Sequence, residues 1–294
     1  MSAATKELKL QSVGIVGTGR LGSALARALL AAGYELAVVA SFGGQSAGRL
    51  ARSLGASVRA LPVAEVPAQA SLIFLAVPDG RIESVCEALP VHAGHAVVHT
   101  SGAQGLAPLA SARAAGAQVG AFHPLQSFSE SAGPGAFGSI SIGVEAEGAL
   151  AAALQRCCER LGARALWLQG VDRARYHAAA VFASNYVVAL QLAAAQAWEL
   201  AGLPRAQAEV ALAPLTLAAA QNLLDAEPAR ALTGPVARGD VQTVERHLAA
   251  LADNPELLLL YRALGAQLLQ LPLALTPETR ARLEHCFVAA TPAD

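Results

Sequence analysis

The stretch GIVGTGRLG, residues 14–22, decides the fold of the first half of the chain. It holds the spacing G-x-G-x-x-G, directly after an apolar run at residues 11–16 and at the start of a helical pattern at residues 20–32. In that context the first glycine permits a tight turn, the second lets a pyrophosphate approach the backbone, and the third lets the helix pack on the strand. A glycine turn that binds nothing is the alternative. The expected dinucleotide contacts are Gly17, Thr18, Gly19, Arg20, Leu21 and Gly22.

Strand-like and helical segments alternate from this motif to residue 168. Apolar runs that indicate further strands lie at residues 35–40, 58–60, 71–77, 96–99, 118–122, 139–144 and 163–168. Helical patterns between them lie at residues 47–54, 82–89, 106–115 and 148–161. Such alternation predicts βαβ units with right-handed crossovers, and therefore a doubly wound parallel sheet.

The rest of the chain shows only helical patterns. They lie at residues 172–201, 204–226, 240–252, 255–271 and 277–290. Pro214 is expected to kink or split the second of these helices. The predicted fold class is therefore α/β followed by all-α. We place the domain boundary near residue 169, with a dinucleotide-binding domain at residues 1–169 and a helical domain for substrate binding and dimerisation at residues 170–294.

Composition limits the classes of function. The 294 residues are 54% hydrophobic and 15% charged with a net charge of -1, which excludes disorder and argues against a nucleic-acid partner. The only lysines, Lys6 and Lys9, precede the first strand, so a lysine in the body of the fold is excluded. The four cysteines lack C-x-x-C spacing, which indicates reduced thiols in a cytoplasmic protein and no metal site.

Residues 178–198 carry no charge, yet their alanine and polar content favours a helix buried in a domain or dimer over a membrane span.

The end of the second strand predicts the type of cofactor. NAD sites usually place an acidic residue there, which accepts a hydrogen bond from the ribose 2′-hydroxyl. Here the strand ends at Ser41, and no acidic residue occurs between Glu35 and Glu65. The same interval contains Arg49, Arg52 and Arg59. Because a carboxylate would repel a 2′-phosphate, the sequence favours NADP(H) over NAD(H). An NAD site, with a serine that only ends the strand, is the alternative.

Ligands in open α/β sheets bind where parallel strands end, so the next strand ends are candidate sites. One strand ends at Val77, Pro78 and Asp79, and Thr100 and Ser101 follow the next strand. These positions are expected to contact the cofactor, with Ser101 beside the reacting centre. Asp79 and Ser101 are equally suited to cap the helices that follow.

A further strand ends in the segment AFHPLQSF, residues 121–128. His123, fixed by the proline after it, is a candidate for proton transfer, and Gln126 is a candidate substrate contact. A lone histidine is more often structural, and that alternative stays open.

The first helix after the boundary carries a polar stripe. His177, Val181, Ser184, Asn185 and Val188 have helical spacing and share one face. His177 is the candidate general acid, because its ordinary pKa suits neutral pH. Asn185 is expected to hold a substrate oxygen or the nicotinamide amide, and Ser184 to contact the substrate. A polar network between helix and sheet is the alternative.

The segment LTGPVARGD, residues 232–240, joins two helices. Arg238 is the candidate cation for an anionic substrate or a phosphate, and Asp240 is suited to cap the next helix. A solvated connection would explain the same residues.

The whole series of motifs resembles a family of bacterial Rossmann-like oxidoreductases. The segments that carry it are GIVGTGRLGSAL (14–25), FLAVPD (74–79), HTSGA (99–103), FHPLQSF (122–128), YHAAAVFASNY (176–186) and LTGPVARGD (232–240). The resemblance implies an NADP-binding domain, a helical domain of unknown function, a cleft between them and dimerisation through the helices. The family is related to pyrroline-5-carboxylate reductase, the deazaflavin-dependent NADP reductases and the β-hydroxyacid dehydrogenases. The last group uses a helix lysine as acid/base, which this sequence replaces with His177 near Asn185.

We therefore expect a cytoplasmic, homodimeric NADP-dependent oxidoreductase. Its substrate is expected to be a small carbonyl, hydroxy or imine compound. The alternative is a non-catalytic NADP(H)-binding sensor or scaffold that acts through a helical dimer.

Overall fold

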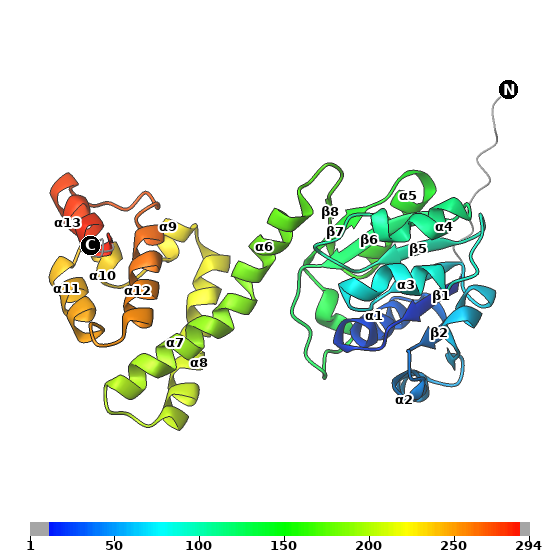
Figure 1. Cartoon of the computed structure of the whole chain (residues 1–294), viewed down its shortest axis with the longest axis horizontal. Coiled ribbons are helices and arrows are strands. Elements are labelled where there is room, and N and C mark those ends of the chain that lie inside the picture. The colour runs from blue at the N-terminus through cyan, green and yellow to red at the C-terminus, as the bar shows by residue number, and fades with distance from the viewer. Residues whose placement is uncertain (1–11, 289–294) are drawn as a thin grey trace. The chain divides into compact units, whose positions relative to one another are not determined.

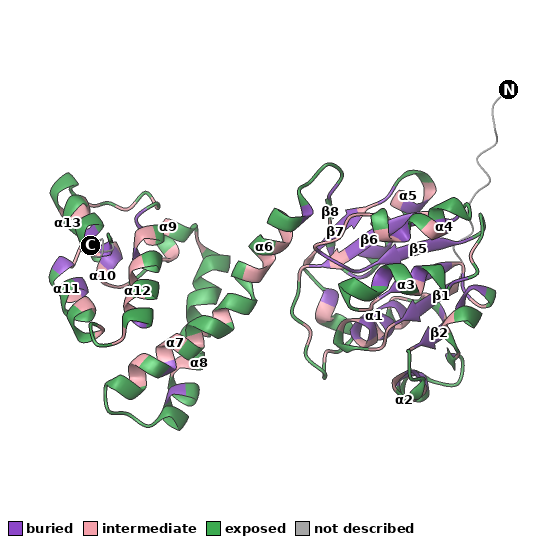
Figure 2. Cartoon of the chain, in the orientation of Figure 1, coloured by how far each residue is buried: buried purple, intermediate pink, exposed green. Residues whose placement is uncertain are grey.

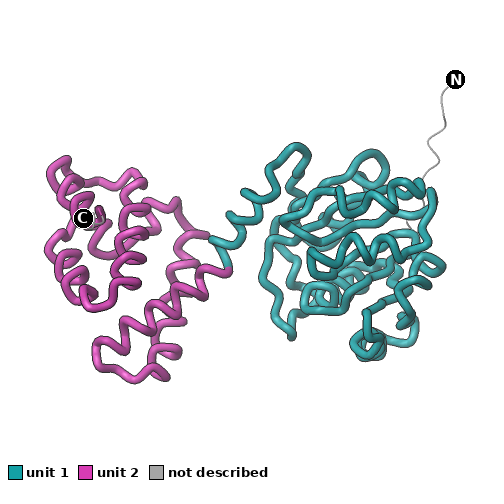
Figure 3. Tube along the Cα trace, viewed as in Figure 1, with its two compact units in different colours: residues 1–184 teal, residues 185–294 magenta. Residues whose placement is uncertain are grey.

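The computed structural model describes residues 12–288, and its contacts divide the chain into two compact units (Figure 3). Unit 1 ends at Ser184 and unit 2 begins at Asn185. Unit 1 therefore includes the helix that follows residue 169, whose first turn is bonded to the rest of the unit through Arg173 and Tyr176. Three residues used in the sequence analysis, Lys6, Lys9 and Gln11, lie outside the described residues.

Unit 1 is built on one sheet with the order β3-β2-β1-β4-β5-β6-β7-β8 (Figure 1). Neighbouring strands from β3 to β6 pair in parallel, which confirms the doubly wound sheet. The strands are β1 (Ser12–Val16), β2 (Glu35–Ala40), β3 (Arg59–Ala60), β4 (Leu72–Leu75), β5 (Ala96–His99), β6 (Gln118–Pro124), β7 (Ser141–Glu145) and β8 (Arg164–Trp167).

Alternate residues of the strands face two separate hydrophobic layers. Ile15 and Phe74 belong to one buried cluster, while Val16 and Leu75 belong to the other. This alternation explains the continuous apolar runs, since strands covered on both faces need no polar side. The helices of unit 1 are α1 (Arg20–Ala31), α2 (Gln45–Leu54), α3 (Ile82–Glu87), α4 (Ala110–Ala114), α5 (Gly148–Arg160) and α6 (Arg173–Ala183). Short 3-10 turns are η1 (Val63–Ala68), η2 (Asp79–Arg81), η3 (Ala107–Leu109) and η4 (Pro134–Phe137).

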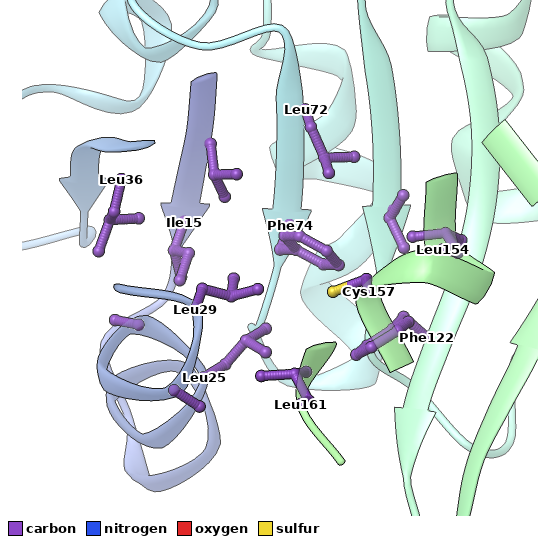
Figure 4. Packing of buried hydrophobic residues seen from close by; sticks show 14 of the residues in the cluster. Ile15, Leu25, Leu29, Leu36, Leu72, Phe74, Phe122, Leu154, Cys157 and Leu161 are labelled. Atoms are coloured by element: carbon purple, nitrogen blue, oxygen red, sulfur yellow. The ribbon is translucent and has the colours of Figure 1, made fainter. Parts of the chain in front are cut away.

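The first layer is the larger core (Figure 4). Leu25 and Leu29 of α1 and Leu154 of α5 pack over Phe74 and Phe122 of the sheet. The two phenylalanine rings meet edge to face with centroids 5.5 Å apart. Helices α3 and α4 supply residues to the second layer. The sheet is thus held on both faces, which fixes the strand ends that carry the candidate site.

The last two strands, β7 and β8, depart from the expected parallel sheet and run opposite to the other strands. β7 pairs antiparallel with β6, and β8 then pairs parallel with β7. The connection from β6 to β7 contains only the 3-10 turn η4 and no α-helix, the element that usually forms a parallel crossover.

The helix expected at residues 172–201 is interrupted. α6 ends at Ala183 and α7 (Asn185–Leu200) begins after Ser184. The Ser184 hydroxyl donates to the carbonyl of Ala180 at 2.8 Å, a local bond that competes with regular helix geometry. The stripe from His177 to Val188 is therefore divided between the two units.

Unit 2 contains the remaining described helices. They are α7, α8 (Arg205–Asp225), α9 (Pro228–Ala231), α10 (Pro235–Arg238), α11 (Val241–Ala250), α12 (Pro255–Leu268) and α13 (Pro277–Phe287). α8 runs unsplit through Pro214, so the predicted split does not occur. Asp240 caps α11 by accepting from the Thr243 N–H at 3.0 Å, as predicted. A small core that includes Val244, Leu283 and Phe287 holds α10 to α13 together.

Candidate functional site

The glycine loop lies between the carboxyl end of β1 and the start of α1. Gly17 has φ +101, and its N–H donates to the Ala40 carbonyl of β2 at 2.8 Å. A Cβ at Gly17 would collide with the Ala76 carbonyl, and a Cβ at Gly22 would collide with the Gly17 carbonyl. These two glycines are therefore required by the close approach of backbone segments.

Gly19 differs from the other two glycines of the motif. A Cβ at Gly19 would meet nothing within 4 Å, so the space beside it is open. Gly19 is also the N-cap of α1, and no side chain caps that helix. Free N–H groups beside open space at a helix start suit an anion such as pyrophosphate. The loop thus fits the dinucleotide that its sequence predicts.

The residues around the end of β2 form a hydroxyl-rich loop. Ser41 Oγ accepts from the Ala47 N–H at 3.2 Å, and Thr18 donates to Ser46 Oγ at 2.8 Å. The three arginines considered for a 2′-phosphate, Arg49, Arg52 and Arg59, are exposed. Arg59 donates to Gln69 at 3.0 Å.

A cation that sequence reasoning missed lies at the same edge. Arg81, from η2, stands over the exposed ring of Phe42 with 5.4 Å between Cζ and the ring centroid. Their separation along the chain hides this pair, because Arg81 follows β4 while Phe42 follows β2. Arg20, by contrast, faces Glu130 at 3.9 Å on the surface.

The loops after β4 and β5 lie at the same edge of the sheet. Val77 is partly buried, and Pro78 and Asp79 are exposed. The Thr100 hydroxyl donates to the Leu75 carbonyl at 3.3 Å. Ser101 Oγ accepts from the N–H groups of Ala103 and Gln104, at 3.2 and 3.0 Å. The Ser101 hydroxyl therefore closes its own turn and does not cap η3, whose N-cap is Leu106, and Asp79 does not cap α3 either, so the capping alternative is wrong for both residues.

His99, at the end of β5, is a buried neutral histidine. Its Nδ1 accepts from the Ser101 N–H at 3.2 Å, so its proton lies on Nε2, which donates to the Gly105 carbonyl at 3.0 Å. Burial lowers the pKa of His99 to about 4. Both ring nitrogens are used in the fold.

His123, Tyr176 and His177 form the polar cluster of the site. His123 Nδ1 lies 2.9 Å from Tyr176 Oη, and the His123 and His177 ring centroids are 5.9 Å apart. Burial, reinforced by the neighbouring His177, lowers the pKa of His123 to about 4. Burial also raises the pKa of Tyr176, so its phenol stays protonated at neutral pH. His177 Nδ1 is buried and finds no hydrogen-bond partner among the described residues.

Two glycines make room for this cluster, and sequence reasoning assigned them no role. A Cβ at Gly102 would lie 2.6 Å from His123 Cε1 and 2.6 Å from His177 Nδ1. A Cβ at Gly143 would lie 2.5 Å from Tyr176 Oη. Each substitution would push a ring of the cluster out of place.

The structure does not bring every candidate residue to this cluster. Gln126 is exposed, and its side chain accepts from the N–H of Ser127 at 2.9 Å. Ser184 is exposed at the end of unit 1. Asn185 and the exposed Arg238 belong to unit 2. Their roles remain predictions, while His123 and His177 are gathered with Thr100 and Ser101 within unit 1.

Comparison with protein families and solved structures bears on this arrangement. Residues 2–124 match the model of the Rossmann-like domain, and residues 140–268 match the Domain of unknown function (DUF2520). The chain pairs a Rossmann-like domain with a DUF2520 domain. This pairing confirms the family resemblance proposed from the sequence motifs. The DUF2520 match begins before β7 and therefore includes the last two strands of the sheet and α6.

Two similar structures extend over most of the chain. One is a Bacteroides fragilis protein that is provisionally assigned as an NADP oxidoreductase, with 26% identity and a TM-score of 0.69. The other is a Thermotoga maritima protein, with 25% identity and a TM-score of 0.69. In both cases the match covers 88% of this chain and 97% of the other.

A more distant structure shares the fold. It is an Aspergillus terreus reductive aminase in complex with NADPH and ethyl levulinate, with 20% identity, a TM-score of 0.59 and coverage of 87% of this chain and 94% of the other. No curated protein matches the chain in sequence.

Proposed function

We propose that this chain is an NADP(H)-dependent oxidoreductase that acts on a small carbonyl, hydroxy or imine compound. The observation that carries the proposal is the common edge of the sheet. The glycine loop follows β1, and the His123–Tyr176–His177 cluster stands at the end of β6. Ligands of open α/β sheets bind at this edge. The similar Bacteroides fragilis protein supports the same class of activity.

The chain's own residues suggest how the cofactor would be held. The N–H groups at the start of α1 would bind the pyrophosphate, and the open space beside Gly19 would admit it. Ser41, Ser46 and Arg81 are the polar groups suited to a ribose 2′-phosphate. When bound, the nicotinamide supplies or accepts the hydride. NADP(H) over NAD(H) is part of the proposal, because no carboxylate stands at the end of β2.

Besides the hydride from the cofactor, the reduction requires a proton at the oxygen or nitrogen of the substrate. The Tyr176 phenol donates to His123 Nδ1 in the tautomer that keeps the His123 proton on Nε2. His177 offers a second ring whose Nδ1 has no hydrogen-bond partner among residues 12–288. In the reductive direction, the imidazolium form of His177 gives its proton to the carbonyl oxygen or imine nitrogen as the carbon receives hydride, and is left as neutral imidazole, while the neutral His123 ring positions the cluster. The described residues contain no lysine, so the lysine mechanism of the β-hydroxyacid dehydrogenases does not fit this chain.

Steady-state NADPH oxidation with a panel of 2-keto acids, imines and aldehydes tests the proposal. We expect turnover with at least one class, and its loss in His177→Ala or His123→Ala with NADPH affinity kept. The matched control is His92→Ala, an exposed histidine before β5. Unchanged turnover in both variants would remove the histidines from the mechanism. Tight NADPH binding with no turnover across the panel would favour the sensor or scaffold. The proposal includes a cytoplasmic location, which agrees with the cysteines, none of which is paired.

A further inference from the structure

Arg173 is a buried arginine in the first turn of α6, and none of the proposed chemical steps uses it. Only 9% of the residue is exposed. Its Nε and Nη2 donate to the Gln104 carbonyl at 3.1 and 2.9 Å, and Nη2 also reaches the Ser101 carbonyl at 3.4 Å. A guanidinium donates through a planar fork, so these bonds fix the loop in both position and orientation. Arg173 thus ties α6 to the loop that follows β5.

Further hydrogen bonds, from Ser101 and His99, also hold the loop that Arg173 contacts. Ser101 Oγ accepts from the N–H groups of Ala103 and Gln104. His99 bonds both ends of the loop, through the Ser101 N–H and the Gly105 carbonyl. The loop is therefore a rigid turn fastened to β5 by His99 and to α6 by Arg173.

The centre of this turn lies against the two rings of the proposed chemistry. The Cβ direction of Gly102 points at His123 Cε1 and His177 Nδ1, each 2.6 Å from the Cβ position. His123 comes from β6 and His177 from α6. A shift of the loop toward or away from α6 therefore changes the space that separates the rings.

We propose that Arg173 is a positioning residue, which holds the Ser101–Gly105 loop against α6 and thereby sets the separation of the His123 and His177 rings. The importance of this ring separation for catalysis rests on the proposed oxidoreductase function. The contacts themselves do not depend on that function.

The charge of Arg173 supports the same role. The groups that face His123 are His177, Tyr176 and Arg173 on α6, Asp79 after β4, and His99 on β5. Burial is the main cause of the low pKa of His123, and His177 and Arg173 add to it, while Asp79 opposes them. Arg173 has no carboxylate within ion-pair distance among residues 12–288, and its Nη1 is buried without a partner there. A second positive charge on His123 is therefore disfavoured, which keeps this ring neutral.

The test compares Arg173→Lys, Arg173→Gln and the control Arg175→Gln in the full chain. Arg175 lies two residues after Arg173 on α6, and its side chain is 90% exposed. Two readouts need no substrate: hydrogen exchange of the Ala103 and Gln104 amides, and titration of the His123 ring by NMR. In Arg173→Gln we expect amide exchange to accelerate about tenfold or more, which is about 1.4 kcal/mol of local opening, and the pKa of His123 to rise. Arg173→Lys keeps the charge but loses the fork, so it should accelerate exchange while the His123 titration stays low. Arg175→Gln should change neither.

A folded Arg173→Gln protein with unchanged amide exchange and unchanged His123 titration would overturn the proposal. If that variant does not fold, unchanged amide exchange in Arg173→Lys overturns it. Once a substrate is known, kcat should fall in Arg173→Lys with the Kd for NADPH kept. A failure to find any substrate would count against the proposed function, whereas the two NMR readouts would still decide the role of Arg173.

Discussion

Glycines at the carboxyl edge of the sheet are required for different physical reasons. Gly17 and Gly22 have no room for a side chain because backbone carbonyls lie against them. Gly19 has open space, and Gly102 lies against two side-chain rings. Because of these differences, substitutions at single glycines can test folding and ligand binding separately.

Substitution of Gly19 by alanine should weaken cofactor binding without loss of stability. The added methyl group has no atom of the described residues within 4 Å, but it occupies the space proposed for the pyrophosphate. We expect the melting temperature to stay unchanged and the Kd for NADPH to rise about tenfold or more, which is about 1.4 kcal/mol. Calorimetric titration and thermal unfolding measure the two effects. The control is Gly135→Ala, which also adds a methyl group in open space, far along the chain in η4. Equal NADPH affinity in Gly19→Ala and wild type would show that the loop binds no dinucleotide.

Gly102→Ala should instead lower stability and turnover while it leaves the affinity for NADPH nearly unchanged. Its Cβ would lie 2.6 Å from both histidine rings, so the rings must move apart. Overpacking of this kind costs about 1–3 kcal/mol of stability. We expect turnover to be lost while the Kd for NADPH stays within about threefold, about 0.65 kcal/mol, of wild type. Full turnover in this variant would show that the spacing of the two rings does not matter for the reaction.

At the scale of elements, the buried histidines at the ends of β5 and β6 predict that the folded chain becomes less stable at acid pH. His99 and His123 have pKa values of about 4 in the folded chain, against 6.5 for an ordinary histidine. Unfolding therefore takes up protons once the pH falls below about 6.5, and stability falls as the pH drops from there toward 4. Each histidine should contribute about 1.4 kcal/mol per pH unit within that window.

Urea unfolding of unit 1 between pH 7.5 and 5 measures this slope. The lower limit keeps most carboxylates ionised, so the histidines dominate the change. His123→Gln should lose about half of the pH dependence, because one of the two titrating rings is gone. Equal stability at pH 7.5 and pH 5 would contradict the burial of neutral histidines at this edge.

The elements also show what the sequence alone can predict. The β1–α1 motif and the strand ends were predictable because each depends on neighbouring residues. The antiparallel β7 was not, since apolar runs carry no direction of pairing. The break at Ser184 was hidden because alanine-rich sequence on both sides favours helix. Arg173 and Tyr176 were missed for a related reason: their partners lie 53 to 72 residues away along the chain, and no local pattern links them.

At the scale of the whole molecule, the helices of unit 2 carry apolar side chains that their neighbours within the unit leave exposed. Figure 2 shows α7 and α8 largely exposed, and on α8 Leu217 and Leu224 are 71% and 82% exposed. The segment Arg173–Leu200 is also long and apolar enough to cross a membrane, and 6% of its most apolar 18-residue window is buried. Such surfaces are unfavourable in water unless they are covered. We predict that a second copy of the chain covers α7 and α8, as the family resemblance implies.

Light scattering on the purified protein tests this prediction. We expect a mass of twice the chain's 29.9 kDa without detergent, and a single-chain mass for Leu217→Glu with Leu224→Glu. The control is Phe42→Ser, which removes an exposed apolar side chain from unit 1 and should leave the mass unchanged. A monomer at all concentrations, or recovery only in the membrane fraction, would contradict the dimer.

The most direct test of the account is calorimetric titration of the purified chain with NADPH, NADH and their oxidised forms. We expect tight binding of NADPH, with a Kd at least about tenfold below that of NADH, which is about 1.4 kcal/mol. Failure to bind any of the four would contradict it, because the glycine loop would then be structural and the oxidoreductase proposal would lose its basis.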